Sequence, residues 1–113
     1  MAVTAFTNSP DTLWVGFVEA VKKGTIRTWE FVDSTHFTHT SEQWSKKAFF
    51  KASTGSGSLT FNLVRPQSSS IATETYAEYH ALLIRVLLAH FDRQFSNVIA
   101  TAMPVSGDII ALG

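Results

Sequence analysis

The sequence contains no cysteine, so disulfide bonds and thiolate metal sites are excluded and no redox compartment can be inferred. Its first residues include neither a basic segment nor a long apolar run, and no transmembrane segment is visible. Phosphate-binding loops, nucleophile elbows, zinc-helix motifs and dinucleotide fingerprints are also absent. We therefore expect a cytoplasmic protein with no membrane partner and no cofactor.

An excess of one charge sign is missing as well, because nine basic residues balance nine acidic ones. A dedicated duplex-DNA binder or a polybasic membrane-surface protein usually carries a strongly basic region. The charges are unevenly distributed, since residues 22–65 hold seven basic and three acidic side chains while both flanking segments are acidic. This balance and this asymmetry favour self-association, with a homodimer as the expected assembly.

What the chain does have is apolar and aromatic character. Hydrophobic residues make up 45% of it, and nine Phe and three Trp argue for an ordered core. A length of 113 residues is typical of one domain. On folding, such a chain buries roughly two thirds of the surface that it exposes when unfolded. The sequence therefore predicts a single domain over residues 1–113.

The longest helical pattern runs from Ser70 to Phe91, where apolar residues recur at the spacing of a buried helical face. We expect a helix over about 71–93 with Ser70 as its N-cap, and a capping box at 75–78 is the alternative start. Because the apolar arc covers most of the circumference, this helix needs neighbours on several sides. It should contact a sheet and the other helix.

A shorter helix is predicted over about 10–23. Ser9 is placed to cap it, and Pro10 suits its first turn because proline has a fixed φ angle and no N–H to leave unpaired. Two lysines and then Gly24 provide a helix end, since glycine tolerates left-handed geometry.

Segments rich in β-branched and aromatic residues predict strands, the first of them at a sheet edge. They are residues 2–7, 25–32, 36–40, 44–53, 59–65, 98–103 and 108–112. The clearest pair is a hairpin around a flexible loop at 54–57, with Leu59, Phe61 and Leu63 on one face of its second strand. Strands clustered between helices indicate an α+β domain. We expect an antiparallel sheet of about four to five strands with both helices packed on one face.

One segment has a spacing that suggests a metal site. Its metal-competent side chains recur at intervals of three: Asp33, His36, His39 and Glu42. In a 3₁₀-like turn these positions would stack and could form a three-ligand site. In a strand, His36 and His39 would point to opposite faces and the site would fail. The favoured interpretation is a solvated polar loop, so no metal site is assigned.

His80 and His90 are the polar exceptions in the apolar arc of the long helix. They lie about 15 Å apart along a helix axis, so they cannot ligate one metal together. Either could act as a general acid or base beside a pocket. The favoured interpretation is a packed histidine with a hydrogen-bond partner.

A binding surface is predicted on the outer face of the sheet, where cations and aromatics alternate. Its residues are Lys47, Phe49 and Lys51, joined by Arg27 and Trp29, with Thr60 and Asn62 on the neighbouring strand. Phosphate neutralisation combined with base stacking is what a single-stranded nucleic acid needs. Zero net charge makes a nucleic acid partner the weaker interpretation, and lysines flanking a partly covered aromatic explain the pattern without a ligand.

The sequence identifies no family. It favours a non-enzymatic binding or self-association module. One alternative is a small enzyme or ligand-binding domain with a pocket between the sheet and the long helix, using His80 or His90. The other alternative is a weak single-stranded nucleic acid binder on the basic and aromatic face of the sheet.

Overall fold

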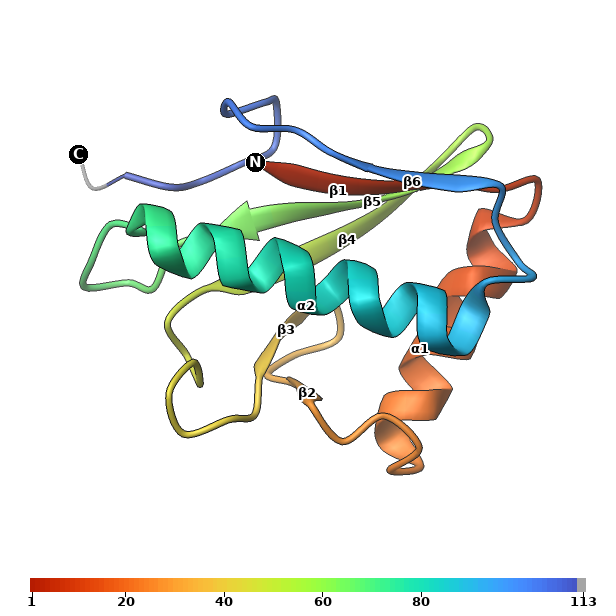
Figure 1. The fold of residues 1–113 in the computed structure, drawn as a ribbon, viewed down its shortest axis with the longest axis horizontal. Helices are drawn as coiled ribbons and strands as arrows, with labels where there is room; N and C mark the ends of the chain where they lie inside the picture. Colours follow the sequence, from red (N-terminus) through yellow and green to blue (C-terminus); the bar gives the residue numbers. More distant parts are fainter. Residues whose placement is uncertain (112–113) are drawn as a thin grey trace.

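The computed structural model describes residues 1–111 and forms one antiparallel sheet of six strands with two helices (Figure 1). The elements in chain order are β1 Ala2–Phe6, α1 Pro10–Lys22, β2 Trp29–Phe31, β3 His36–His39, β4 Phe49–Gly55, β5 Ser58–Val64, α2 Thr73–Phe91 and β6 Asn97–Ala100. The strand order across the sheet is β2-β3-β4-β5-β1-β6. The α+β class is confirmed. The predicted count of four to five strands is too low, although each of the six strands overlaps a segment in which the sequence predicts a strand.

The strand β1 is interior to the sheet, so its predicted place at an edge is wrong. It pairs with β5 on one side, where Ala2 lies opposite Asn62, and with β6 on the other, where Val3 lies opposite Ala100. Val3 and Ala5 are completely buried beneath α2, which packs on β1. Their small side chains leave room for that helix, whereas the short and weakly alternating sequence of β1 resembles that of an edge strand.

Both ends of α1 follow the sequence signals. It begins at Pro10 and ends at Lys22, and Gly24 has a φ angle of 80°. Ser9 occupies the N-cap position, but its side chain makes no capping hydrogen bond. The Ser9 carbonyl instead accepts the N–H of Leu13 at 3.0 Å, which is the first bond of the helix.

The start of α2 differs from the prediction. The helix begins at Thr73 with Ala72 as its N-cap, so the cap predicted at Ser70 is wrong. Ile71 is held outside the helix because its N–H donates to the Ile110 carbonyl at 3.0 Å. A contact between distant segments therefore overrides the local signal. Ile110 belongs to the predicted strand 108–112, of which only an isolated bridge between Ile109 and Val64 forms; residue 112 lies outside the described residues.

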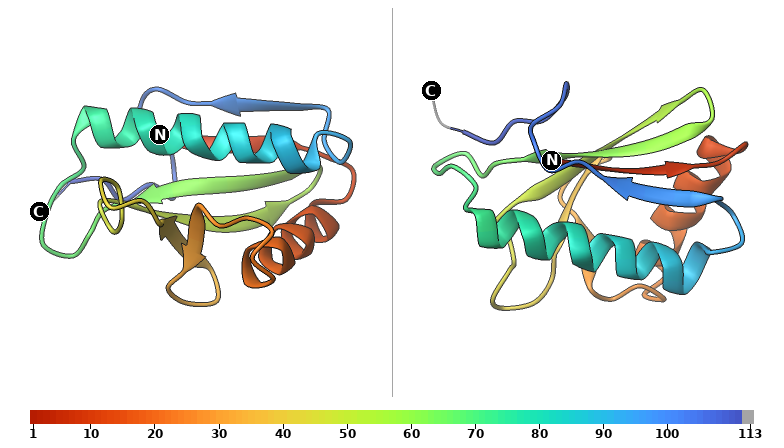
Figure 2. Two further views of the ribbon diagram at one scale, coloured as in Figure 1. Left: turned by 60° about the horizontal axis from the view of Figure 1, so that its bottom comes forward. Right: turned by 45° about the horizontal axis from the view of Figure 1, so that its top comes forward.

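The core is a cluster of apolar and aromatic side chains between one face of the sheet and both helices. Figure 2 shows the course of the two helices relative to the sheet. Phe17 of α1 contacts Phe37 of β3 at a ring-centroid distance of 5.0 Å and Phe91 of α2 at 6.2 Å. Tyr79 of α2 contacts Trp29 of β2 at 5.6 Å. The two helices thus touch each other as well as the same face of the sheet, as the broad apolar arc of α2 predicted. Each such ring stabilises the fold by roughly 1.5–3 kcal/mol through burial.

A buried polar contact shapes the turn that leads into β4. The Tyr79 hydroxyl donates to the Trp44 carbonyl and lies 3.0 Å from the Thr38 hydroxyl oxygen. Thr38 Oγ1 also accepts the N–H of Lys46 at 3.0 Å, where the backbone has a φ angle of 58°. These bonds hold residues 41–47 in a turn, so β4 begins at Phe49 and not at Trp44 as predicted. Within residues 1–111, neither helix combines the length and apolar character needed to cross a bilayer.

Candidate functional site

The four residues of the proposed metal spacing are not brought together. His36 and His39 lie at the two ends of β3, where His36 is opposite Lys51 and His39 is opposite Trp29. Three residues apart in a strand, they point to opposite faces of the sheet. Glu42 is exposed in the following turn. Within residues 1–111, no group of three or more His, Asp or Glu side chains could hold a metal ion.

Asp33 and His36 instead close the turn between β2 and β3. Asp33 Oδ1 accepts the backbone N–H groups of Thr35 at 2.9 Å and His36 at 2.8 Å, and it lies 3.0 Å from His36 Nδ1. The bonds from the Thr35 and His36 backbones, with the His36 ring, lower the pKa of Asp33 to about 2. A carboxylate at this position therefore has a turn-forming role that explains it without a metal.

The predicted binding face is only partly assembled. Phe49 and Lys51 lie on the face of β4 away from the helices, and Asn62 of β5 lies opposite Lys51. Lys47 is exposed in the turn before β4. Arg27 precedes β2, and its Nε donates to the Gly24 carbonyl at 3.2 Å.

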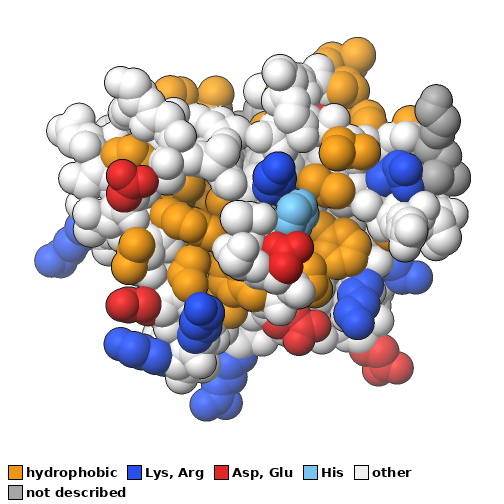
Figure 3. Space-filling view, turned by 180° about the vertical axis from the view of Figure 1, so that it is seen from behind, with side chains coloured by type: hydrophobic (Ala, Val, Ile, Leu, Met, Phe, Trp, Pro, Cys, Tyr) orange, Lys and Arg blue, Asp and Glu red, His pale blue; other side chains and the backbone are white. Residues whose placement is uncertain are grey.

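Trp29 does not belong to that face. It is 2% exposed and lies in the core, so its predicted outward orientation is wrong. Because β2 has only three residues, the packing of their rings and not a sequence alternation decides which side faces inward. The face seen from behind in Figure 3 carries a band of hydrophobic side chains, with basic and acidic residues intermingled around it. A nucleic acid role for Phe49 and Lys51 stays a prediction.

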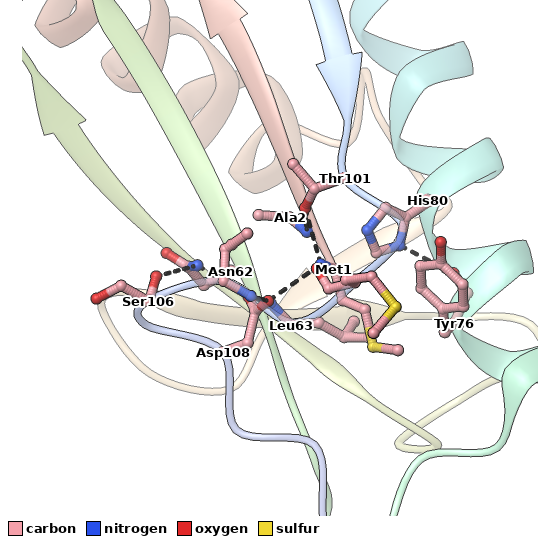
Figure 4. A network of polar contacts seen from close by, with 11 residues as sticks. Met1, Ala2, Asn62, Leu63, Tyr76, His80, Thr101, Ser106 and Asp108 are labelled. Atoms are coloured by element: carbon pink, nitrogen blue, oxygen red, sulfur yellow. Dashed lines mark hydrogen bonds and ion pairs between the residues drawn. The ribbon is translucent and has the colours of Figure 1, made fainter.

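His80 is buried near Met1, the residue that precedes β1 (Figure 4). Its Nδ1 donates to the Tyr76 carbonyl at 2.9 Å, and its Nε2 is buried without a hydrogen-bond partner. Burial lowers the pKa of His80, so the ring is neutral at pH 7. With the proton on Nδ1, Nε2 carries a lone pair.

The neighbourhood of His80 is closed by the α-ammonium of Met1. This group lies 3.1 Å from Asp108 Oδ2 and donates to Thr101 Oγ1 at 2.8 Å (Figure 4). The Asp108 carboxylate also accepts from the Asn62 side chain at 2.9 Å and from the Val105 N–H at 2.8 Å. Its side chain is 1% exposed. This network fixes the segment after β6 against β1 and β5.

His90, by contrast, is exposed and lies at the rim of a groove between α2 and the β2–β3 end of the sheet. The groove has a volume of about 290 Å³. Its apolar wall is formed by Leu82, Val86 and Ala89 of α2. Thr28, His39, Arg85 and His90 supply its polar groups.

His39 is the most buried polar group of that groove, with 5% of its surface exposed. Its Nδ1 is bonded to Ser41, whereas Nε2 has no partner. The sequence singled out His39 only as a metal ligand and did not connect it with His90. Its place in β3 opposite Trp29 depends on strand pairing, which a single sequence does not reveal.

A larger hollow of about 690 Å³ lies between the start of α1 and the end of α2. Its polar lining includes Asn8, Ser9 and Arg93, all of them exposed. It contains none of the buried unpartnered polar atoms, which belong to Trp29, His39, Arg65 and His80. The groove at His39 differs from this hollow in having a buried histidine among its lining residues.

No protein-family model, no curated protein and no solved structure matches this chain. Function is therefore argued from the outer edge of β6, with which no strand of residues 1–111 pairs.

Proposed function

We propose that this chain is a self-association module that pairs with a second copy through the edge of β6. The observation that carries the proposal is that this edge lacks the usual protection. Natural edge strands are blocked by charged residues, prolines or bulges, because an open row of backbone N–H and C=O groups recruits other strands. The strand β6 reads Asn97-Val98-Ile99-Ala100 and contains none of these.

The surroundings of β6 are apolar and uncharged. Residues 94–107 contain no Asp, Glu, Lys or Arg. Ile99 is 44% exposed, and the following segment exposes Met103 and Val105. Ile99 lies opposite Thr4, on the face of the sheet away from the helices. An apolar side chain is therefore available beside the open backbone edge.

The absence of charge suits two-fold symmetry. In an isologous dimer each residue near the axis meets its own copy, so a charge in β6 would face the same charge. An antiparallel pairing of β6 with β6 of a second copy brings no such repulsion. It would satisfy the edge backbone groups and cover part of Ile99 in both copies.

The test is the oligomeric state measured by sedimentation velocity and light scattering over about 1–500 μM. Wild type is expected to show a concentration-dependent monomer–dimer equilibrium. Ile99→Lys should raise the dimer dissociation constant at least about tenfold, because two lysines then become cross-strand neighbours. Val32→Lys is the matched control, since Val32 is 46% exposed and lies at the other end of the sheet, directly after β2.

A charge-complementation experiment makes this test specific to the β6 edge. Ile99→Lys and Ile99→Glu are each expected to be monomeric, and an equimolar mixture should form a heterodimer. A wild-type protein that remains monomeric at every concentration would refute the proposal. So would a dimer that Val32→Lys weakens as strongly as Ile99→Lys.

A further inference from the structure

The outer side of α2 carries an apolar stripe. It consists of Ala77, Ala81, Ile84 and Leu88, which follow one another at intervals of four, three and four residues. This spacing aligns the four side chains along one side of a helix, and it is the spacing by which two helices pair. Leu88 is 50% exposed, both alanines are exposed, and Ile84 is half-buried. The described chain therefore covers this stripe only in part.

The stripe lies on the side of α2 next to β6. His80 marks this side, because it lies beside Met1, whose α-ammonium donates to Thr101 directly after β6 (Figure 4). Val86 marks the other side, because it lines the groove at the β2–β3 end of the sheet. At about 100° per residue, the stripe positions fall within about 100° of His80 and at least about 140° from Val86 around the helix axis. Figures 1 and 2 show β6 running alongside α2.

The helix side of β6 is apolar as well. Val98 lies opposite Ala5 and Ala100 lies opposite Val3, and both of these β1 residues are buried beneath α2. Residues directly opposite each other in an antiparallel pair share a face of the sheet, so Val98 and Ala100 are on the helix side. Val98 is half-buried and Ala100 is exposed. An apolar surface therefore extends from the open edge of β6 toward the stripe.

The edge of β6 is too small to hold a dimer by itself. It has four residues, and two strands paired without further packing are marginally stable in water. A stable interface buries about 800 Å² on each partner. Ile99 adds apolar surface only on the face of the sheet away from the helices. A dimer through β6 therefore needs burial on the helix side too, where the stripe lies.

The stripe is complementary to itself when two copies are antiparallel. Positions at equal distances from its midpoint then meet, so Ala77 contacts Leu88 of the other copy and Ala81 contacts Ile84. Each small side chain meets a large one, and such pairs interdigitate at close approach. A parallel arrangement would instead place alanine on alanine and leucine on leucine.

The charges beside the stripe favour the same orientation. Glu74 and Glu78 are exposed on the first half of α2, and Arg85 is exposed on the second half. None of them forms an ion pair within residues 1–111. Antiparallel packing brings Glu78 of each copy close to Arg85 of the other, whereas parallel packing brings like charges together.

We propose that the stripe binds the same stripe of a second copy, so that two α2 helices pack antiparallel beside the paired β6 strands. The proposal rests on self-association through β6 and extends that interface to the helices. One two-fold axis is sufficient, because the axis between two antiparallel β6 strands also makes the two α2 helices antiparallel.

Two exposed alanines on opposite sides of α2 provide the test. In sedimentation velocity, Ala81→Glu should raise the dimer dissociation constant at least about tenfold, because a carboxylate is then buried in each copy. Ala89→Glu is the matched control and should leave the constant within about twofold, since Ala89 lines the groove on the other side of the helix. Glutamate is a good helix former, so both variants should fold.

Disulfide trapping tests the orientation. The chain has no cysteine, so each introduced thiol is the only one in its copy. In an oxidised mixture of Ala77→Cys and Leu88→Cys, the mixed disulfide should exceed either homodisulfide at least about fivefold, because only antiparallel helices bring these positions within bonding distance. Ala77→Cys mixed with Ala89→Cys is the control and should give no such excess.

The outcomes separate this proposal from pairing through β6. If Ile99→Lys weakens the dimer and Ala81→Glu does not, the helical contact is refuted and the β6 pairing stands. If Ala81→Glu weakens it and Ile99→Lys does not, the β6 pairing is refuted and the helical contact stands. Equal losses in Ala81→Glu and Ala89→Glu, or a predominant Ala77→Cys homodisulfide, would overturn the antiparallel stripe. A wild-type protein that is monomeric at every concentration refutes both.

Discussion

The two buried histidines, His39 and His80, are alike in burial and opposite in chemistry. Both are 5% exposed, burial lowers the pKa of both, and each leaves Nε2 unpartnered. His39 accepts a backbone N–H on Nδ1 and therefore presents Nε2 as a donor. His80 donates Nδ1–H to Tyr76 and therefore presents a lone pair.

This difference teaches that burial alone does not mark a site. The orphan atom of His39 belongs to a side chain that lines a groove with Arg85 and His90. His80 packs beside the network of Met1 and Asp108 and lines none of the described cavities. The two rings therefore differ in the position of the proton and in whether the side chain lines a groove.

The largest expected effect on stability comes from substituting Asp108, whose hydrogen-bond network lies beside His80. Asp108→Ala should lower the free energy of unfolding by about 3 kcal/mol, because a buried carboxylate with several donors leaves them unpaired when it is removed. Urea denaturation measures this loss. Asp33→Ala is the control, since Asp33 also accepts several donors but is exposed, and its effect should be clearly smaller. Equal losses would contradict the argument that burial makes the Asp108 network the stronger of the two.

A smaller loss of stability is expected when the turn at residues 41–47, which contains the hydrogen-bond partner of His39, loses a supporting bond. Tyr79→Phe removes the hydroxyl bonded to the Trp44 carbonyl and should cost about 1.5 kcal/mol. Loosening the turn at 41–47 should also broaden the His39 ring signals in NMR spectra. Tyr76→Phe is the matched control, because within residues 1–111 the Tyr76 hydroxyl makes no hydrogen bond, and it should change stability by less than about 0.5 kcal/mol. If Tyr79→Phe changes neither the stability nor the His39 signals, the Tyr79 hydroxyl does not hold this turn.

Acidification should act on both histidines in the same direction. Their pKa values are lowered by burial, so below about pH 6.5 the unfolded chain binds protons that the folded chain does not. Stability is therefore complete above that pH and decreases as the pH falls through the folded-state pKa values. Thermal melts from pH 8 to 5 measure the slope. His39→Gln and His80→Gln should each flatten it.

The final prediction concerns proton position and involves no change in stability. Long-range ¹⁵N correlation spectra should assign the Nε2–H tautomer to His39 and the Nδ1–H tautomer to His80. Identical tautomers in the two rings would contradict the comparison directly. The spectra need only wild-type protein and one histidine variant for assignment.

Local signals in the sequence were sufficient where the structure depends on local geometry. Pro10 and Gly24 bound α1, and Leu59, Phe61 and Leu63 alternate into the core as predicted. Tertiary contacts explain the failures. The bond from Ile71 to residue 110 moved the start of α2, and ring packing turned Trp29 inward.

The site was less predictable than the fold. His90 lies beside a groove at α2, but the sequence does not show that His39 faces the same groove, because a strand has to pair before its neighbours are known. The tautomer of His39 depends on Ser41, two residues further on, whose N–H is turned back by the turn at 41–47. Such chemistry arises from backbone geometry, for which this segment has no sequence motif.

The interior position of β1 has a consequence for biosynthesis. This strand is synthesised before both of its neighbours in the sheet, β5 and β6, which lie far along the chain from it. Pairings between residues so distant in sequence slow folding, because the loop must close before the contacts form. The nascent chain therefore holds Val3 and Ala5 without their partners until most of the domain has been synthesised, a period in which a chaperone can bind them.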